Sequence, residues 1–387
     1  MDAHKRHVFL YKIFRTVFTP FFRLRVNYRP EKHPIGGGCL VVSNHVTDLD
    51  PIMLGITVRD HVYFVASDHI FRKSFAAKLL RWAQDPILRV KGTTAGDTAL
   101  TCIRRLRKGY NVALFAEGNR SYNGQTSAII ESTAKLARSS GATLVTHRFR
   151  GGYLTSPRWS GSKLRKGKMT GEVVGVYPPE QLKAMKPAAI AEIIRRDIYE
   201  NAYETQREWM IPYKCKAPAE HLERALYLCP RCRKLNTLQS RGDELFCSCG
   251  LRTKLNEYGF FENKELPFDN VLDWDKWQAQ TLTEMLQAPA DGAIVSDTAI
   301  RLTEVIDTAT QTDFGCGELR AYGDRFEFGA QTFPFADITG INLSGPQGLE
   351  LSCGGRHWFL ASAEVRDLRK YVSIYRAVTD PDNILAI

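Results

Sequence analysis

The sequence contains no uncharged apolar run long enough to cross a lipid bilayer, which takes about 20 consecutive apolar residues. The best candidate, residues 8–26, is interrupted by four basic side chains, and no small-residue cleavage site follows it. We therefore expect neither a transmembrane helix nor a signal peptide there. Because phenylalanine, leucine and valine alternate with arginine and lysine, this stretch predicts an interfacial helix on a membrane surface. The alternative is an amphipathic helix packed on its own domain.

The sequence also lacks a glycine-rich nucleotide-binding loop and a Gly-x-Ser-x-Gly motif. These absences exclude nucleotide-driven chemistry and serine-hydrolase chemistry of the usual kinds. Hydrophobic residues make up 44% of the chain and charged residues 25%, as in an ordinary folded protein. The 387 residues are enough for two or three domains.

Acidic residues are scarce in the first part of the chain. Residues 1–212 hold 34 of the 53 Lys and Arg residues and 17 of the 42 Asp and Glu residues, a net charge of +17. Residues 213–387 are net negative, at −6. A basic surplus suits an anionic membrane surface, nucleic acid or phosphorylated substrates, and charge alone does not choose among them.

The pattern of short apolar runs and amphipathic stretches predicts the domain organisation. In residues 1–212, strands alternate with helices, which favours an α/β sandwich around a mostly parallel sheet. A cysteine-containing segment, 213–264, and a tryptophan-rich linker helix, 265–293, follow. Residues 294–387 show short runs bounded by Gly, Asp and Pro and then one helix, which predicts a small β-barrel or sandwich of the pleckstrin-homology (PH) kind.

The first candidate site is the sequence S-N-H-V-T-D-L-D at residues 43–50, where a predicted strand ends and a helix begins. It places His45 and Asp50 in an H-x4-D arrangement. An alcohol is a poor nucleophile, and an imidazole can take its proton as it attacks a thioester carbonyl. A carboxylate behind the ring would fix its tautomer and stabilise the imidazolium. Alone, a histidine near a helix start is more often a capping or core residue than a catalytic one.

The second candidate site is the sequence F-A-E-G-N-R-S at residues 115–121, which also ends a predicted strand. Gly118 lets the backbone approach a ligand closely, and Arg120 offers a forked donor that matches phosphate oxygens. Glu117 could hold that arginine or accept a glycerol hydroxyl. The alternative for this segment is a plain strand-to-loop turn with a surface ion pair.

Together, the two motifs resemble the glycerolipid acyltransferase family, specifically the 1-acylglycerol-3-phosphate acyltransferases, which carry N-H-x-S/T-x-x-D and F-P-E-G-T-R-S in this order and separation. The first motif is intact, with Thr47 at the hydroxyl position, whereas the second has Ala116 in place of proline and Asn119 in place of threonine. Neither change removes a charged group or the glycine. The resemblance covers roughly residues 5–210.

The resemblance implies roles for individual residues. It assigns His45 as the general base and Asp50 as its orienting partner, and it assigns the second motif to the glycerol phosphate. Within the segment I-L-R-V-K-G at residues 87–92, Lys91 stands where the family commonly has a phosphate-binding arginine, and Arg89 is the alternative. The predicted substrate-binding set is Asn44, Thr47, Lys91, Glu117, Gly118 and Arg120.

The resemblance further implies transfer of a fatty acyl group from acyl-CoA or acyl-carrier protein to lysophosphatidate, at the cytoplasmic face of a membrane, with no cofactor for catalysis. Glycerol 3-phosphate or another lysophospholipid is the alternative acceptor. A lipid-binding scaffold without catalysis is the rival of another class.

The third candidate site is a cysteine cluster, Cys229-x2-Cys232 followed by Cys247-x-Cys249. Four thiolates at this spacing predict a structural zinc in a zinc ribbon, with no open coordination position. The alternative is four buried cysteines without metal. A zinc-ribbon nucleic-acid-binding protein is disfavoured, because the half that contains the ribbon is net negative. The ribbon and the β domain resemble a C-terminal extension of some bacterial members of the family.

Overall fold

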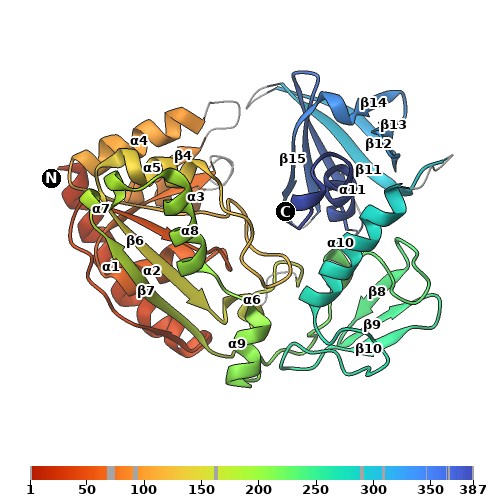
Figure 1. The fold of residues 1–387 in the computed structure, drawn as a ribbon, viewed down its shortest axis with the longest axis horizontal. Helices are drawn as coiled ribbons and strands as arrows, with labels where there is room; N and C mark the ends of the chain where they lie inside the picture. Colours follow the sequence, from red (N-terminus) through yellow and green to blue (C-terminus); the bar gives the residue numbers. More distant parts are fainter. Residues whose placement is uncertain are drawn as a thin grey trace. The chain divides into compact units, whose positions relative to one another are not determined.

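The computed structural model divides into two compact units (Figure 1). The first comprises Met1–Pro157 and Leu164–Tyr213, and the second comprises Arg158–Lys163 and Lys214–Ile387. From Lys214 onward, the predicted segments 213–264, 265–293 and 294–387 share the second unit, whereas Tyr213 itself belongs to the first. The residues that the structure describes are 2–67, 75–89, 95–160, 164–287, 292–306, 310–345, 347–362, 364 and 367–385.

The first unit is built on a seven-stranded sheet of order β1-β7-β6-β2-β5-β3-β4. All neighbouring strands are parallel except the pair β6 and β7, which is antiparallel. This sheet confirms the predicted α/β fold. The strands are β1 (Tyr28–Pro30), β2 (Cys39–Ser43), β3 (Val62–Ser67), β4 (Ile87–Arg89), β5 (Asn111–Phe115), β6 (Thr143–Arg150) and β7 (Met169–Tyr177).

Helices cover both faces of this sheet. Successive side chains of a strand point to opposite faces, so each strand contributes side chains to the packing on both. In β2, Leu40 and Val42 pack in a core with α4, α5 and α8, whereas Val41 packs in a second core with residues of α1 and α2. Both faces are therefore apolar, as expected for parallel strands. The helices are α1 (Ala3–Arg25), α2 (Asp50–Val58), α3 (Phe75–Gln84), α4 (Ala95–Arg107), α5 (Ser132–Ser140), α6 (Gly152–Thr155), α7 (Pro179–Ala184), α8 (Pro187–Ile198) and α9 (Ala202–Trp209).

Helix α1 is amphipathic. Phe22 is buried against the sheet, whereas Phe9, Val17 and Leu24 are exposed on the other side of the helix. Basic side chains, including Arg23 and Arg25 in its last turn, interrupt the apolar sequence. Among the described residues, no helix combines the length and the apolar character that a membrane crossing requires.

The second unit contains two antiparallel sheets. A three-stranded sheet of order β10-β9-β8 precedes helix α10, and a seven-stranded sheet of order β14-β13-β12-β11-β17-β16-β15 is followed by helix α11. The elements are η2 (Leu222–Arg224), β8 (Leu238–Arg241), β9 (Glu244–Cys247), β10 (Arg252–Lys254), α10 (Val271–Gln287), β11 (Val295–Val305), β12 (Gln311–Ala321), β13 (Arg325–Phe328), β14 (Gln331–Pro334), η3 (Phe335–Asp337), β15 (Ile338–Ser344), β16 (Gly348–Cys353), β17 (Arg356–Ser362), α11 (Arg369–Thr379) and η4 (Pro381–Asn383).

Two buried ion pairs tie helix α11 into the second unit. Arg369 pairs with Asp275 of α10 at 2.7 Å, and Lys370 pairs with Asp297 of β11 at 2.7 Å. All four side chains are essentially inaccessible to solvent. Removing one partner of a buried pair leaves an uncompensated charge, so these pairs fix how the helix packs on the sheet.

Candidate active site

The two sequence motifs meet at one edge of the first sheet. His45 follows the end of β2, and Glu117 follows the end of β5. Because β2 and β5 are neighbouring parallel strands, their carboxyl ends lie at the same edge. The backbone N–H of Ser121, in the second motif, donates to the carbonyl of His45 over 3.1 Å. Residues about 70 positions apart in the sequence therefore form one site.

The His45 imidazole is held by the Asp50 carboxylate. Nδ1 of His45 lies 2.8 Å from Oδ2 of Asp50, the first residue of α2. Asp50 is fully buried, and it also accepts hydrogen bonds from the backbone of Val46 and from the backbone and hydroxyl of Thr47. A carboxylate at Nδ1 stabilises the tautomer that carries the proton there. Nε2 is then the ring nitrogen that can accept a proton from a substrate.

Glu117 is a buried link between the two motifs. Its Oε1 accepts the backbone N–H of His45 over 2.6 Å, and its Oε2 accepts the backbone N–H of Ser127 over 2.6 Å. Burial raises the pKa of this carboxyl to about 8, although the two backbone hydrogen bonds act in the opposite direction. The side chain thus faces the protein backbone and fixes the position of His45.

Gly118 and Arg120 shape the loop beside this link. Gly118 has φ +73°, a backbone conformation that favours glycine, whereas the nearest obstacle to a Cβ, Cδ1 of Ile130 at 2.9 Å, is the end of a side chain that can move aside. Arg120 Nη1 lies 3.1 Å from Oδ2 of Asp48 in the first motif. The Asp48 side chain is 83% exposed, whereas that of Arg120 is 14% exposed. The guanidinium therefore lies beside the first motif loop.

Asn44 and Thr47 make their hydrogen bonds within the protein. The Asn44 amide donates to the carbonyl of Phe149 and accepts its N–H, over 3.0 and 2.8 Å, which joins the end of β2 to β6. The Thr47 hydroxyl donates to Asp50 over 2.6 Å. Asn44 and Thr47 therefore hold the first motif in place through hydrogen bonds within the protein. Lys91, the predicted phosphate ligand of the β4 region, lies outside the described residues.

Phe115, the last residue of β5, has no role that the motif chemistry predicts. Its ring stacks on the His45 ring, with centroids 4.3 Å apart and planes 17° from parallel. The only sequence signal for this contact is the position of Phe115 at the start of the second motif.

Comparison with known proteins finds a family model that spans both motifs. The model of the Acyltransferase family matches residues 25–150, which include both motifs. Residues 25–150 form an acyltransferase domain. Among solved structures, the 1-acyl-sn-glycerophosphate acyltransferase PlsC from Thermotoga maritima is similar with a TM-score of 0.43 and 18% identity, over 51% of this chain and 82% of that one. The C-terminal PH domain of human FYVE, RhoGEF and PH domain containing protein 3 is similar with a TM-score of 0.18 and 13% identity, over 24% of this chain and 93% of that one.

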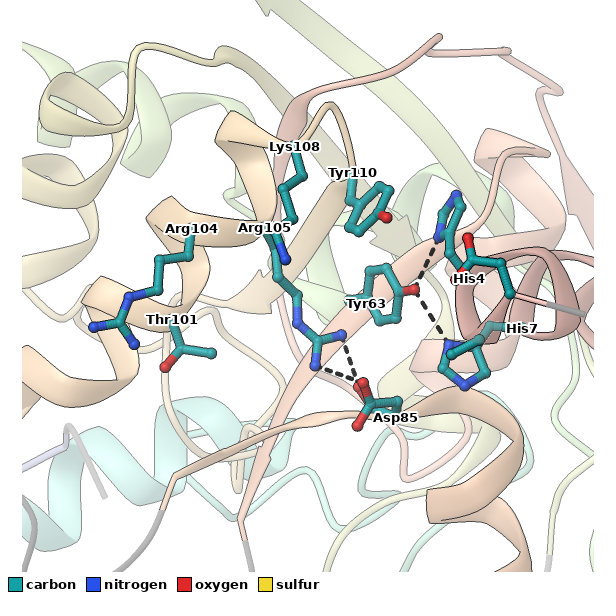
Figure 2. Close-up of a pocket in the computed structure, with 11 residues that line it drawn as sticks. His4, His7, Tyr63, Asp85, Thr101, Arg104, Arg105, Lys108 and Tyr110 are labelled. Atoms are coloured by element: carbon teal, nitrogen blue, oxygen red, sulfur yellow. Dashed lines mark hydrogen bonds and ion pairs between the residues drawn. The ribbon is translucent and has the colours of Figure 1, made fainter.

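A cavity of about 370 Å³ lies in the same unit as the acyltransferase domain, at the opposite edge of the sheet from His45 (Figure 2). It is bordered by the first turns of α1, by α4 and by Tyr63 near the amino end of β3. The Tyr63 hydroxyl bonds to Nδ1 of His4 and of His7, over 2.9 and 3.2 Å. Arg105 bonds to Asp85. These contacts attach α1 to the amino edge of the sheet, away from the motifs.

The four cysteines of the predicted zinc ribbon come together in the second unit, outside the acyltransferase domain. Their sulfur atoms all lie within 4.8 Å of one another. Cys229 and Cys249 are 3.7 Å apart, and Cys232 and Cys247 are 3.8 Å apart. The residue after the second knuckle, Gly250, has φ +91° and allows the chain to turn back. The cluster can hold one metal ion.

Proposed function

We propose that this acyltransferase moves a fatty acyl group from an acyl thioester, carried by CoA or acyl-carrier protein, to the free hydroxyl of lysophosphatidate. The observation that carries the proposal is the His45–Asp50 pair, which is held at the sheet edge beside the second motif. The nearness of Glu117 and Arg120 to this pair supports a phosphate-bearing acceptor.

In the proposed reaction, the acceptor hydroxyl attacks the thioester carbonyl while Nε2 of His45 takes its proton. Asp50 holds the ring in the reactive tautomer and stabilises the imidazolium, and general-base catalysis of this kind contributes about 10²–10⁴ in rate. The tetrahedral intermediate collapses, the C–S bond breaks, and the proton on His45 passes to the leaving thiolate. The products are the new ester and the free thiol, and no metal or nucleotide enters the step.

Arg120 is the proposed ligand of the acceptor phosphate, together with Lys91. Its guanidinium can donate two parallel hydrogen bonds to phosphate oxygens. One partner of Arg120 in the structure, Asp48, is mostly exposed. A dianionic phosphate can compete with this carboxylate for the guanidinium. Glycerol 3-phosphate or another lysophospholipid would use the same contacts.

We propose that the enzyme works on the cytoplasmic face of a membrane and that α1 is the contact. Phe9, Val17 and Leu24 of α1 are exposed by 57%, 60% and 75%. Large apolar side chains beside arginine and lysine suit the boundary between headgroups and acyl chains. The net charge of residues 1–212, +17, adds attraction to anionic lipids.

The cysteine cluster is proposed to bind a structural zinc. Four thiolates at a Zn–S distance of about 2.3 Å in a tetrahedron lie roughly 3.8 Å from one another. The distances of 3.7 and 3.8 Å fit this arrangement. With four protein ligands the ion has no open position, so its contribution is to the folding of the segment around it.

The experiment that tests the function is acyl transfer from labelled acyl-CoA and labelled acyl-carrier protein to lysophosphatidate and glycerol 3-phosphate in liposomes. The wild type is compared with His45→Ala and with His33→Ala, a control at an exposed histidine of the same unit. Turnover that is lost in His45→Ala and kept in His33→Ala supports the proposal and identifies both substrates. An inactive wild type, or a His45→Ala variant as active as the wild type, would leave lipid binding without catalysis as the better function.

A further inference from the structure

Three aromatic rings stand in a row across strands β2, β5 and β3 of the first sheet. His45 follows β2, Phe115 ends β5, and Phe64 lies in β3, and these three strands are neighbours in this order. The His45 and Phe115 rings are 4.3 Å apart and 17° from parallel, and the Phe115 and Phe64 rings are 6.5 Å apart and 11° from parallel. One face of the proposed general base is therefore covered by an aromatic ring.

The hydrogen bond to Asp50 does not by itself fix the His45 ring. It holds one atom, Nδ1, at 2.8 Å from the carboxylate, while the torsion that turns a histidine ring is broad. The ring face of Phe115 supplies the missing constraint, because a parallel neighbour at 4.3 Å leaves no room for the imidazole to tilt toward it. The carboxylate and the aromatic face together determine where Nε2 points.

The same contact affects the charge that forms on His45. When Nε2 takes the proton, the imidazolium lies over the face of Phe115, well inside the distance of about 6 Å at which a cation and an aromatic face attract each other. This attraction stabilises the positive charge that the ring carries during the reaction. Leucine fills a similar space and has no such face.

We propose that Phe115 is a positioning residue for the general base: it sets the plane of the His45 ring and stabilises the imidazolium formed during acyl transfer. This inference rests on the proposed function, and it adds a requirement for an aromatic ring at the first position of the second motif. The Phe64 ring packs against Phe115 and is not stacked on the imidazole.

The test compares Phe115→Leu and Phe115→Tyr in the full-length protein, with Phe64→Leu as the matched control on the neighbouring strand. We expect kcat of Phe115→Leu to fall about 10- to 100-fold with KM for both substrates unchanged, because a misdirected base lowers the rate of the chemical step. Phe115→Tyr and Phe64→Leu remain within about threefold of the wild type.

The ring geometry has a second readout that does not depend on turnover. The face of Phe115 shifts the NMR signals of the His45 ring protons upfield, and this shift should disappear in Phe115→Leu and persist in Phe115→Tyr. An active wild type with an unchanged kcat in Phe115→Leu refutes the positioning role alone. A wild type that transfers no acyl group overturns the proposed function and the catalytic role of Phe115 together, and the NMR shift then reports only the stacking.

Discussion

Glu117→Gln separates a structural role of this side chain from substrate binding. Glutamine has almost the same size, but one of its two terminal groups is an NH2 donor. In the wild type each carboxyl oxygen accepts a backbone N–H, from His45 and from Ser127, at 2.6 Å. One of those N–H groups would face another donor in the variant, and a buried N–H without a partner costs about 1–3 kcal/mol.

The loss of stability in Glu117→Gln depends on pH, and the raised pKa of Glu117 sets the direction of this dependence. Burial raises the pKa of Glu117 to about 8 from an ordinary value of 4.5, so between these values the folded protein holds a proton that the unfolded chain has released. The contribution of this group to the free energy of unfolding therefore falls as pH rises from about 4.5 to 8, by at most about 5 kcal/mol, and is constant above that range. Glutamine does not titrate, so the gap between wild type and variant is largest near pH 5 and narrows toward pH 8.

Urea unfolding of both proteins from pH 5 to 9 measures this gap, with Glu131→Gln as a control at an exposed glutamate. Steady-state kinetics distinguishes the structural role of Glu117 from a role in substrate binding. If the His45 backbone shifts, kcat falls, by about 100-fold for a displacement near 1 Å, and KM for the acceptor is unchanged. The reasoning is refuted if the wild type and Glu117→Gln show the same dependence of unfolding on pH. A higher acceptor KM with unchanged kcat would instead restore the substrate-binding role that the sequence suggested.

Four further substitutions have defined outcomes. Asp50→Asn should lower kcat by about 10²–10⁴ in the acyl-transfer assay, because an amide at this position no longer selects the reactive tautomer of His45. Arg120→Lys should raise KM for lysophosphatidate about tenfold and leave a phosphate-free monoacylglycerol unaffected, since lysine lacks the forked donor. Cys232→Ser should lower the metal content from one zinc per chain, measured by mass spectrometry, and lower Tm. Leu24→Glu should weaken sedimentation with anionic liposomes.

Each of these variants has a control of the same chemistry on the surface. Asp382→Asn, Arg107→Lys, Cys215→Ser and Ile306→Glu alter exposed residues outside the catalytic edge, the cysteine cluster and α1. The role proposed for a substituted residue is wrong if its control variant and its test variant give the same result. For the cysteine cluster, full zinc content in Cys232→Ser would be enough to reject a four-thiolate site.

The sequence predicted those parts of the site that local order determines. A strand that ends at residue 43 and a helix that begins at Asp50 place the imidazole and the carboxylate on one short turn, so their proximity follows from neighbouring residues. The alternation of strands and helices in residues 1–212 similarly led to the observed α/β sheet. The close approach of the four cysteines was also predictable, because a knuckle spacing brings each pair together.

Contacts set by tertiary register could not be predicted in the same way. The Asn44 side chain bonds to the backbone of Phe149, 105 residues away, because β6 is the neighbour of β2. Glu117 reaches the backbone of His45 because β5 lies on the other side of β2. Motif spacing carries no information on either arrangement. The residues that suggest ligand binding in the sequence, Asn44, Thr47 and Glu117, therefore make their hydrogen bonds to the protein in the structure.

The path of the chain between the two units limits how parts of related proteins can be exchanged. The chain leaves the first unit after Pro157, contributes Arg158–Lys163 to the second and returns at Leu164. Within that excursion Trp159 is 2% exposed, and its carbonyl accepts a hydrogen bond from Arg224 over 3.4 Å. The units are thus joined at three points along the chain, and a cut after Tyr213 leaves this excursion without the unit to which it belongs. Exchange of the C-terminal half between related enzymes would succeed only if residues 158–163 were exchanged with it.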